Sequence, residues 1–442
     1  METNPGKPTR GKSFRGAVGR GSKRVLQSAG AQFTSKGERF RRLAESHSAA
    51  VAGDTLITMS LAGSLFFQVP SSEARDKMAL YLLLTLAPFT VIGPLLTRLF
   101  LRFPTAYRAG IILSTAARTL VAFGLLITGL DSIWLFPLAF LLLISSRVHG
   151  IGRGSLMPVV IDNPVELVSA NARLARIGIL TTAVVALSGV GLVAIAPWLA
   201  IAVASVLFAA ATVAGVQLPA VPSDQVVGGW RRRAPAPRGV RLARVATAGV
   251  RFLNGYLLML VAFAFRDVDA PVADFGAMLA GAGFGFFVAS LTSPWLERHL
   301  REEPMVVASL AVEAAAAFVA AQIFGLPAAV ALAGAAGLAW GTAKFGYDGL
   351  LQSTVTPEDR GHAFTVSETI FQSAWVLGAL LPVVISIPVG FGLALAGVGA
   401  LLAQLVYISG LLVPLAEARR LKVETPSDPD PEPQHPEVTD YL

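Results

Sequence analysis

The sequence predicts an all-α polytopic membrane protein, and three observations support this fold class. Of the 442 residues, 54% are hydrophobic and only 14% are charged, whereas about one quarter of a soluble domain is charged. Apolar runs long enough to cross a bilayer recur along nearly the whole chain. Such runs form helices, because a helix satisfies its backbone polar groups within its own segment.

The apolar runs predict twelve membrane helices in two pseudo-symmetric halves of six, separated by one long connection rich in proline and arginine. The expected helices lie near residues 47–69, 78–100, 106–128, 133–157, 167–195, 198–217, 246–266, 272–296, 304–325, 327–351, 362–386 and 389–414. The expected parts are a basic cytoplasmic leader with an interfacial helix (1–45), an N-terminal bundle (46–217), a basic cytoplasmic linker (218–245), a C-terminal bundle (246–416) and a disordered acidic, proline-rich tail (417–442).

Basic residues gather on one side of the expected membrane helices. The leader carries eleven Lys and Arg residues against three Glu residues, and the central linker is also basic. Because Lys and Arg mark cytoplasmic loops, we expect a multi-pass protein of the plasma (inner) membrane with both termini in the cytoplasm. We interpret the leader as a topology signal that touches anionic membrane lipids.

One stretch of the leader matches the sequence pattern of a nucleotide-binding loop. Residues 6–13, from Gly6 to Ser13, match the pattern GxxxxGK[ST]. A phosphate-cradling loop needs a strand before it and a helix after it, yet only five residues precede the motif and no βαβ pattern follows. We therefore expect neither a nucleotide nor a nucleic acid as partner. The chain has no cysteine, which excludes thiolate metal sites, and we expect no cofactor or metal.

Charged residues stand inside two of the glycine-rich apolar runs. Arg147, His149 and Arg153 follow one another in the fourth expected helix, and Lys344 and Asp348 lie in a comparable position in the tenth. A charge at membrane depth is costly, so it normally faces the bundle interior or a wet cavity. The repetition indicates a duplicated transporter built around a central polar path.

The turn after the second helix also recurs in the second half, since residues 93–98 (GPLLTR) parallel residues 293–298 (SPWLER). With the two six-helix halves, this pattern resembles the major facilitator superfamily over roughly residues 46–416. In the family's GxxxDRxGRR loop the fifth position is acidic, whereas this chain has Thr97 there and so departs from the family pattern. The resemblance implies transport by alternating access between the halves. The gating residues it implies are Gly93, Arg98, Pro294, Glu297 and Arg298.

A further likeness concerns the branch of that superfamily. Residues 147–152 (RVHGIG) are similar to the Arg and Gln-Gly-x-Gly element of proton-coupled exporters, but they are one residue short and lack the Gln. The connection from Pro158 to Asn171 is similar to the corresponding loop of siderophore and drug exporters. The resemblance therefore implies an exporter of drug or siderophore type.

Asp54 and His149 are the candidate proton-coupling residues. Asp54 lies among Gly53, Thr55 and Thr58 of the first helix, and a carboxyl at membrane depth is a functional candidate by default. A structural hydrogen-bonding role suits Asp54 equally well. Histidine titrates near neutrality, although a single histidine is more often a satisfied polar contact.

A mixed polar and aromatic set is expected to line a substrate cavity. Arg147 could pair with Asp54 or with an anionic substrate, and Lys344 and Asp348 share a face because they are four residues apart on one helix. Such a cavity favours a lipophilic or aromatic solute. The cavity candidates are Arg147, Lys344, Asp348, Asn254, Tyr256, Trp340, Tyr347, Gln372 and Trp375.

Four other charged residues receive structural roles in this interpretation. Glu368 is expected to stabilise the start of the eleventh helix. Arg118 and Glu313 are expected to pack beside lipid, in helices that flank the bundle. Arg153 is expected to extend toward the cytoplasmic surface.

The leading hypothesis is a monomeric secondary active transporter, not an enzyme, that uses protons to export a lipophilic or amphipathic small molecule. A lipid or lysolipid flippase of the same fold is one alternative, and a cavity open laterally to lipid would favour it. A transport-inactive scaffold or sensor is another, which would depend on the basic leader and the acidic tail.

Overall fold

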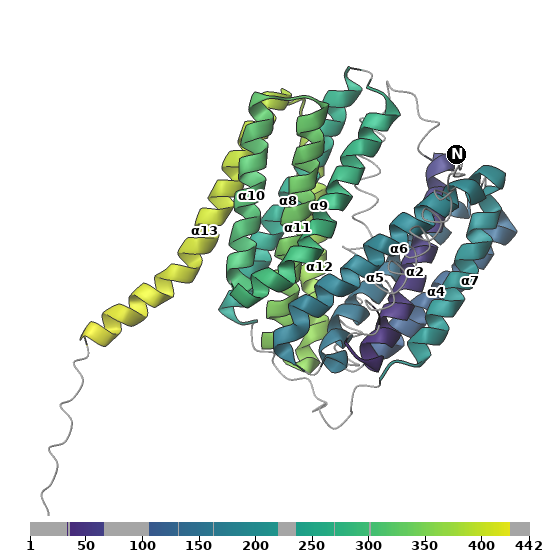
Figure 1. Ribbon diagram of the computed structural model, residues 1–442, viewed down its shortest axis with the longest axis horizontal. Coiled ribbons are helices and arrows are strands. Elements are labelled where there is room, and N and C mark those ends of the chain that lie inside the picture. Colours follow the sequence, from purple (N-terminus) through teal and green to yellow (C-terminus); the bar gives the residue numbers. More distant parts are fainter. Residues whose placement is uncertain are drawn as a thin grey trace, which may run out of the picture.

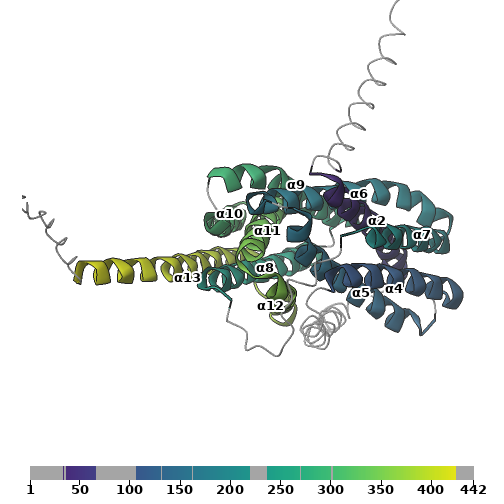
Figure 2. The same cartoon turned by 90° about the horizontal axis from the view of Figure 1, so that it is seen from below.

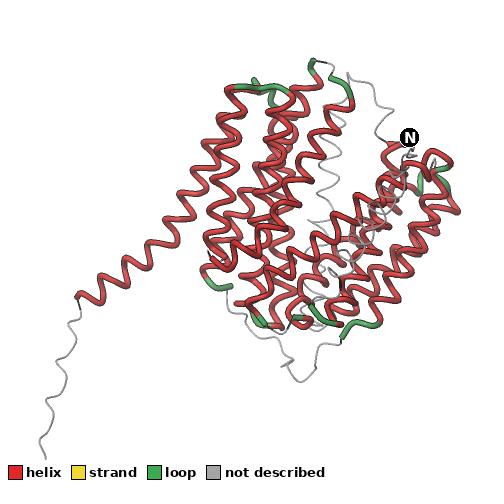
Figure 3. The backbone as a smooth tube through the Cα atoms, viewed as in Figure 1, coloured by secondary structure: helices red, strands yellow, loops and turns green. Residues whose placement is uncertain are grey.

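In the computed structural model of the chain, residues 33, 36–65, 106–130, 132–161, 163–219, 236–268, 270–299 and 302–424 are described. The regular elements in these ranges are all helices (Figure 3). Eleven long helices are α2 (Glu38–Leu65), α4 (Tyr107–Thr128), α5 (Leu135–Val160), α6 (Leu167–Ile195), α7 (Pro197–Val216), α8 (Arg238–Arg266), α9 (Val272–His299), α10 (Glu302–Gln322), α11 (Leu326–Thr354), α12 (Pro357–Val384) and α13 (Val389–Glu424), and the short 3-10 helix η2 (Pro164–Glu166) precedes α6.

The helices form two bundles that stand side by side (Figures 1 and 2). In the first, α2 packs on α6 and α7, and α4 packs on α5 and α7. In the second, α8 packs on α12 and α13, while α11 packs on α9 and α10. Nine of the described helices are long and apolar enough to cross a membrane. The predicted all-α membrane architecture is confirmed, whereas the count of twelve stays a prediction because the expected span 78–100 lies outside the described residues.

The outer surface of the bundles is apolar. On α4, Leu113, Leu120 and Ile127 recur every seventh residue and are 68%, 72% and 72% exposed. Residues seven apart lie on one face of a helix. A long exposed apolar face of this kind suits a helix that lies against lipid.

Among the described residues, the two bundles share an apolar core at one end only. The first bundle joins the shared core through the starts of α2, α4 and α6 and the end of α5, for example Phe40 and Leu156, and the second bundle contributes Phe364 among others. At the opposite end, the cluster around Leu56 belongs to the first bundle alone, and the cluster around Phe263 belongs to the second alone. The bundles are therefore joined where α5 leads into α6 (Figure 1).

Polar contacts reinforce the joined end. Asn171 Nδ2 of α6 donates to Gln352 Oε1 of α11 at 2.6 Å, and Gln352 Nε2 donates to the carbonyl of Gly154 in α5 at 2.8 Å. The backbone N–H of Gly361 in α12 donates to the hydroxyl of Tyr107 in α4 at 3.2 Å. Gln352 is 1% exposed, and its amide joins the two bundles through these direct hydrogen bonds.

Replacing Gln352 with leucine should loosen the joined end. The change leaves the Asn171 amide and the Gly154 carbonyl without their partner, which costs about 1–3 kcal/mol per buried group. The equilibrium should then shift by about 10-fold or more toward conformations in which this end is open. A single cysteine at the buried position Ala172, in a chain with no other cysteine, would report this as faster maleimide labelling.

Gln404→Leu is the matched control, because Gln404 Nε2 donates to the carbonyl of Val307 within the second bundle. Equal labelling rates in the two variants would show that Gln352 does not hold the bundles together.

Glycines bring four helices of the second bundle into backbone contact. A Cβ on Gly285 of α9 would lie 1.8 Å from the carbonyl oxygen of Gly334 in α11. A Cβ on Gly255 of α8 would lie 2.0 Å from the carbonyl oxygen of Trp375 in α12. Small residues permit this close approach of membrane helices, and the α8–α12 contact places Trp375 beside α8.

Gly285→Ala should therefore separate α9 from α11. The overlap is with backbone rather than with a movable side chain, so the cost should reach about 3 kcal/mol or more. Thermal unfolding in detergent, followed by the folded fraction on size exclusion, would measure it. Gly283→Ala on the same helix is the control, since nothing lies within 4 Å of its added Cβ; similar losses in both variants would contradict the explanation.

Two helices extend beyond the expected boundaries. α2 begins at Glu38 and runs unbroken past residue 45, where the leader was expected to end. Its first turns carry ion pairs from Glu38 to Arg41 and Arg42, and the hydrogen bond from Arg41 lowers the pKa of Glu38. α13 continues to Glu424, so residues 417–424 are helical rather than part of a disordered tail.

Candidate functional site

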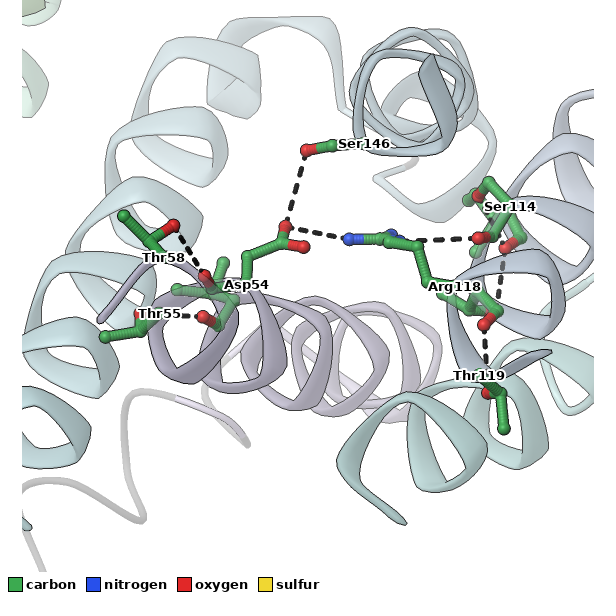
Figure 4. A network of polar contacts seen from close by, with 10 residues as sticks. Asp54, Thr55, Thr58, Ser114, Arg118, Thr119 and Ser146 are labelled. Carbon is green, nitrogen blue, oxygen red and sulfur yellow. Dashed lines mark hydrogen bonds and ion pairs between the residues drawn. The ribbon is translucent and has the colours of Figure 1, made fainter. Parts of the chain in front are cut away.

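An ion pair crosses the middle of the first bundle (Figure 4). Arg118 Nη1 of α4 lies 2.8 Å from Asp54 Oδ2 of α2. The hydroxyl of Ser146 on α5 donates to the same carboxylate oxygen at 3.3 Å. Three helices therefore converge on Asp54, whose side chain is 35% exposed.

Arg118 is the fixed member of this pair. It is 0% exposed, its Nε donates to the carbonyl of Ser114 at 3.3 Å, and its guanidinium lies 5.1 Å from the ring centre of Phe208. The expectation that Arg118 packs beside lipid is wrong. Its position at the centre of α4 was the available signal, because an ionisable residue at membrane depth normally faces the interior.

A second charged centre lies in the second bundle. Lys344 Nζ lies 2.7 Å from Asp348 Oδ1 and 2.6 Å from Glu368 Oε1. The local pairing of Lys344 with Asp348 agrees with their shared helix face. Glu368 lies in the interior of α12 rather than at its start, so the expected helix-start role is wrong, and one cation serves two acids.

Two arginines of α5 connect the two centres electrostatically. Arg147 interacts with Asp54 of its own bundle and with Glu368 of the other. Arg153 interacts with Asp348 and Glu368 across the same boundary. Arg118, rather than Arg147, makes the direct ion pair with Asp54. Charges on α5, α11 and α12 thus act on one another across the boundary between the bundles.

Arg251 of α8 completes the group and was not among the sequence candidates. Its guanidinium lies 4.5 Å from the ring centre of Trp340 and 5.7 Å from that of Trp375. It interacts electrostatically with Glu368 and with Arg147. A single charge in an otherwise apolar helix centre was the signal for it. Trp340 and Trp375 therefore lie beside a buried charge, and their place in a substrate cavity stays a prediction.

His149 lies in a buried polar cluster beside the ion pair of the first bundle. Its ring stacks with that of His47 at 6.1 Å, and His149 is 5% exposed. Neither ring nitrogen has a hydrogen-bond partner in the described part of the chain. Arg153 Nη1 contacts His47 Nε2 at 3.3 Å, so Arg153 is held inside the bundle and does not extend to the surface as expected.

Four of the cavity candidates are buried or hydrogen-bonded inside the second bundle, and their role in a cavity stays a prediction. The hydroxyl of Tyr256 donates to the carbonyl of Gly392 at 3.2 Å inside the second bundle. Tyr347 is 0% exposed, and its hydroxyl bonds with Ser367 and accepts from Arg244. Gln372 is buried in α12. Asn254 donates to the carbonyl of Val250 at 2.9 Å, and its amide also faces Glu313. The polar groups of Asn254, Tyr256 and Tyr347 thus have partners within one bundle.

Glu313 is buried rather than lipid-adjacent, which corrects the second flanking expectation. It is 1% exposed in α10, and its Oε1 lies 3.5 Å from Asn254 Nδ2. Its Oε2 has no hydrogen-bond partner in the described residues. Burying a carboxyl group with so few hydrogen bonds is costly.

The predicted gate is described only in part. Pro294, Glu297 and Arg298 lie in the last turns of α9. One turn earlier, the carbonyl of Ser290 accepts from Arg176 Nη2 of α6 at 2.9 Å, so this stretch adjoins the joined end. Gly93, Arg98 and the Gly6–Ser13 motif lie outside the described residues. Within the described ranges, no group of three His, Asp or Glu side chains could hold a metal ion.

Taken together, the site is a row of charged side chains that passes from one bundle to the other, with aromatic rings at its second-bundle end. Its acids are partly accessible, since Asp54 is 35% and Glu368 is 27% exposed. Such a site can bind and release protons and can hold a charged solute between the bundles.

Comparison with known sequences gives relatives without an assigned role. No protein-family model matches the sequence. An uncharacterized protein of Mycobacterium leprae (strain TN) is 27% identical over 379 residues, which cover 76% of this chain and 65% of that protein. An uncharacterized protein of Mycobacterium tuberculosis (strain ATCC 25618 / H37Rv) is 35% identical over 135 residues, 29% of this chain and 24% of that protein. The chain thus spans less than two thirds of either relative.

Comparison with solved structures is informative about the fold. A bacterial homologue of the iron transporter ferroportin in its outward-facing state has a TM-score of 0.62 at 16% identity and covers 84% of this chain and 99% of its own. The major facilitator superfamily transporter FucP in the outward conformation has a TM-score of 0.59 at 12% identity, with coverage of 86% and 99%. The human organic anion transporter MFSD10 has a TM-score of 0.58 at 15% identity, with coverage of 83% and 99%. At these identities the likeness is one of fold.

Proposed function

We propose that this chain, which has the fold of the major facilitator superfamily transporters, is itself a membrane transporter that works by alternating access between its two bundles. The main support is the row of charges that crosses from one bundle to the other through Arg147. Buried charges at this depth are expensive unless they line a wet path. Bundles that share a core at one end and keep separate cores at the other suit a path that opens to one side at a time.

Asp54 is the proposed proton-coupling residue. Arginine does not give up its proton in proteins, so Asp54 is the member of the Asp54–Arg118 pair that can titrate. Protonation of Asp54 would cancel the ion pair and leave Arg118 buried without its counter-charge, which weakens the hold of α4 on α2. His149 stays a second candidate, because a histidine ring can bind a proton and it stacks on the ring of His47 in the same cluster.

The described conformation suits an outward-open state. The joined end carries the turn between α5 and α6 and the start of α4, which the distribution of basic residues assigns to the cytoplasm. With both termini cytoplasmic, the closed end would face the cytoplasm of a cell whose plasma membrane holds the protein. Two of the structures with this fold are of outward states.

The proposed cargo is a lipophilic or amphipathic small molecule that is exported in exchange for protons. Trp340 and Trp375 provide aromatic rings beside the charges, and the buried ring of Phe371 supports Trp340 edge to face at 6.2 Å. Aromatic walls with a few polar groups are typical of sites for such molecules.

Transport in proteoliposomes would test this function. Purified protein would be reconstituted and given an imposed pH gradient, with 1-naphthalenesulfonate and trimethyl(1-naphthylmethyl)ammonium as impermeant aromatic probes of opposite charge. We expect gradient-driven movement of at least one probe, and a protonophore should stop it. If neither probe moves faster than in empty liposomes, the proposed function is wrong for aromatic solutes.

A further inference from the structure

The charges of the central group do not balance. Five cationic side chains, Arg118, Arg147, Arg153, Arg251 and Lys344, face three anionic ones, Asp54, Asp348 and Glu368. The second expected span, 78–100, lies outside the described residues, but its sequence contains no Asp or Glu. Among the described residues, this group therefore holds two more cationic than anionic side chains.

Arg251 is where this excess is concentrated. Each acid of the group already has a closer cation: Asp54 has Arg118, and Asp348 and Glu368 both have Lys344. In the described part of the chain, no ion pair joins Arg251 to a carboxylate, although Glu368 attracts it from a greater distance. Arg147 of α5 also acts electrostatically on Arg251, so the cations of the two bundles influence each other across the boundary between them.

The surroundings of Arg251 hold its guanidinium in place. Trp340 of α11 lies 4.5 Å and Trp375 of α12 lies 5.7 Å from it, each measured from the ring centre. Tryptophan faces orient a guanidinium by cation–π attraction. The position of Trp375 is fixed in turn by the backbone contact at Gly255. A guanidinium fixed in this way presents its N–H fork for two parallel hydrogen bonds to a carboxylate, sulfonate or phosphate.

Resting on the transporter proposed above, we infer that its substrate is an organic anion with an aromatic body, whose acidic group binds Arg251 opposite Arg147 and whose ring packs on Trp340 and Trp375. Such an anion offsets one of the two excess positive charges when it binds. It also brings together the guanidinium groups of the two bundles, which otherwise repel each other. Arg251 is thus a specificity-determining residue that selects anions and rejects cations.

Binding and transport measurements together separate this inference from the proposed function. Equilibrium dialysis of the purified protein would use radiolabelled 1-naphthalenesulfonate, the isosteric 1-naphthoate and trimethyl(1-naphthylmethyl)ammonium. Each probe has the same ring, so differences in affinity report on charge. We expect both anions to bind at least tenfold more tightly than the cation.

Variants of arginines on α8 locate the site. Arg251→Gln should lower the affinity for the sulfonate at least tenfold, and Arg251→Lys should recover only part of it because an ammonium cannot form the paired hydrogen bonds. Arg241→Gln is the matched control, since Arg241 lies on the exposed face of the same helix. The control should bind like the unmodified protein.

Each outcome has a distinct meaning. The inference is wrong if the cation binds as tightly as the anions. It is also wrong if Arg251→Gln leaves the affinity for the anions unchanged. If the imposed pH gradient drives transport of the cation but not of the anions, the proposed transporter function is supported and the inferred anion selectivity is wrong. If the anions bind through Arg251 but no probe is transported, the anion site is supported and the proposed proton-driven transport is wrong.

Discussion

Asp54→Asn is expected to reduce pH-driven transport to the level of empty liposomes while the protein still folds. Asparagine keeps the size of the side chain, and its carbonyl oxygen can still accept from Arg118 Nη1 and the Ser146 hydroxyl, which lie 2.8 and 3.3 Å from Asp54 Oδ2. It cannot bind or release a proton. The site is thereby fixed in one charge state, so the gradient has no group through which to act.

The measurement is initial flux of the better probe under an imposed pH gradient, compared with exchange of labelled for unlabelled probe at equal pH. Exchange needs no proton movement, and it should persist in Asp54→Asn. Asp54→Glu, which restores a titrating carboxyl, should recover part of the driven flux. If Asp54→Asn follows the gradient as the unmodified protein does, the coupling residue lies elsewhere, and His149 becomes the next to replace.

Lys344→Met is expected to have the largest effect on stability. The change leaves Asp348 and Glu368 near each other without their common cation, with side chains only 10% and 27% exposed. Removing one partner of a buried ion pair costs about 3–5 kcal/mol, because an uncompensated charge remains. Thermal unfolding in detergent should show a clear loss of folded protein at temperatures the unmodified chain withstands.

The triple variant Lys344→Met, Asp348→Asn, Glu368→Gln distinguishes charge imbalance from lost packing. With all three charges removed, folding should recover, because neutral groups of similar size replace the cluster. Arg42→Ala is the control, since its ion pair with Glu38 lies at the exposed start of α2 and should leave unfolding unchanged. An unfolding temperature for Lys344→Met equal to that of the unmodified protein would show that the cluster does not stabilise the second bundle.

The sequence was most informative where the relevant contact lies within one helix. Lys344 and Asp348 could be paired because residues four apart share a face, and the apolar runs located the helices because hydrocarbon thickness sets their length. Contacts between helices could not be obtained this way. Glu368 pairs with Lys344 from another helix, and Arg118 pairs with Asp54 across 64 residues. The spacing of these residues in the sequence therefore does not predict either ion pair.

The aromatic candidates show a similar limit. Trp340 and Trp375 lie at the central charges because Arg251 stands beside them, whereas the hydroxyls of Tyr256 and Tyr347 bond within the bundle. Composition alone could not separate these two groups, since all four side chains occur in equally apolar helices. The distinction depends on which helix face meets which neighbour, and that is set by the glycine contacts between α8 and α12 and between α9 and α11.

Those glycine contacts make the two bundles mechanically unequal. In the second bundle, glycines meet the backbone of the neighbouring helix, as at Gly255 and Gly285. In the first, Gly53 meets the ring of Phe208 and Gly189 meets the side chain of Met59, and the backbone approach is looser, since a Cβ on Gly152 would lie 3.0 Å from the carbonyl oxygen of Tyr107. Two helices whose backbones touch cannot move past one another without separating, whereas a side chain in the contact can change its rotamer. Amide hydrogen exchange should therefore be slower along α8, α9, α11 and α12 than along α2 and α6, with the first bundle deforming while the second turns as a rigid block.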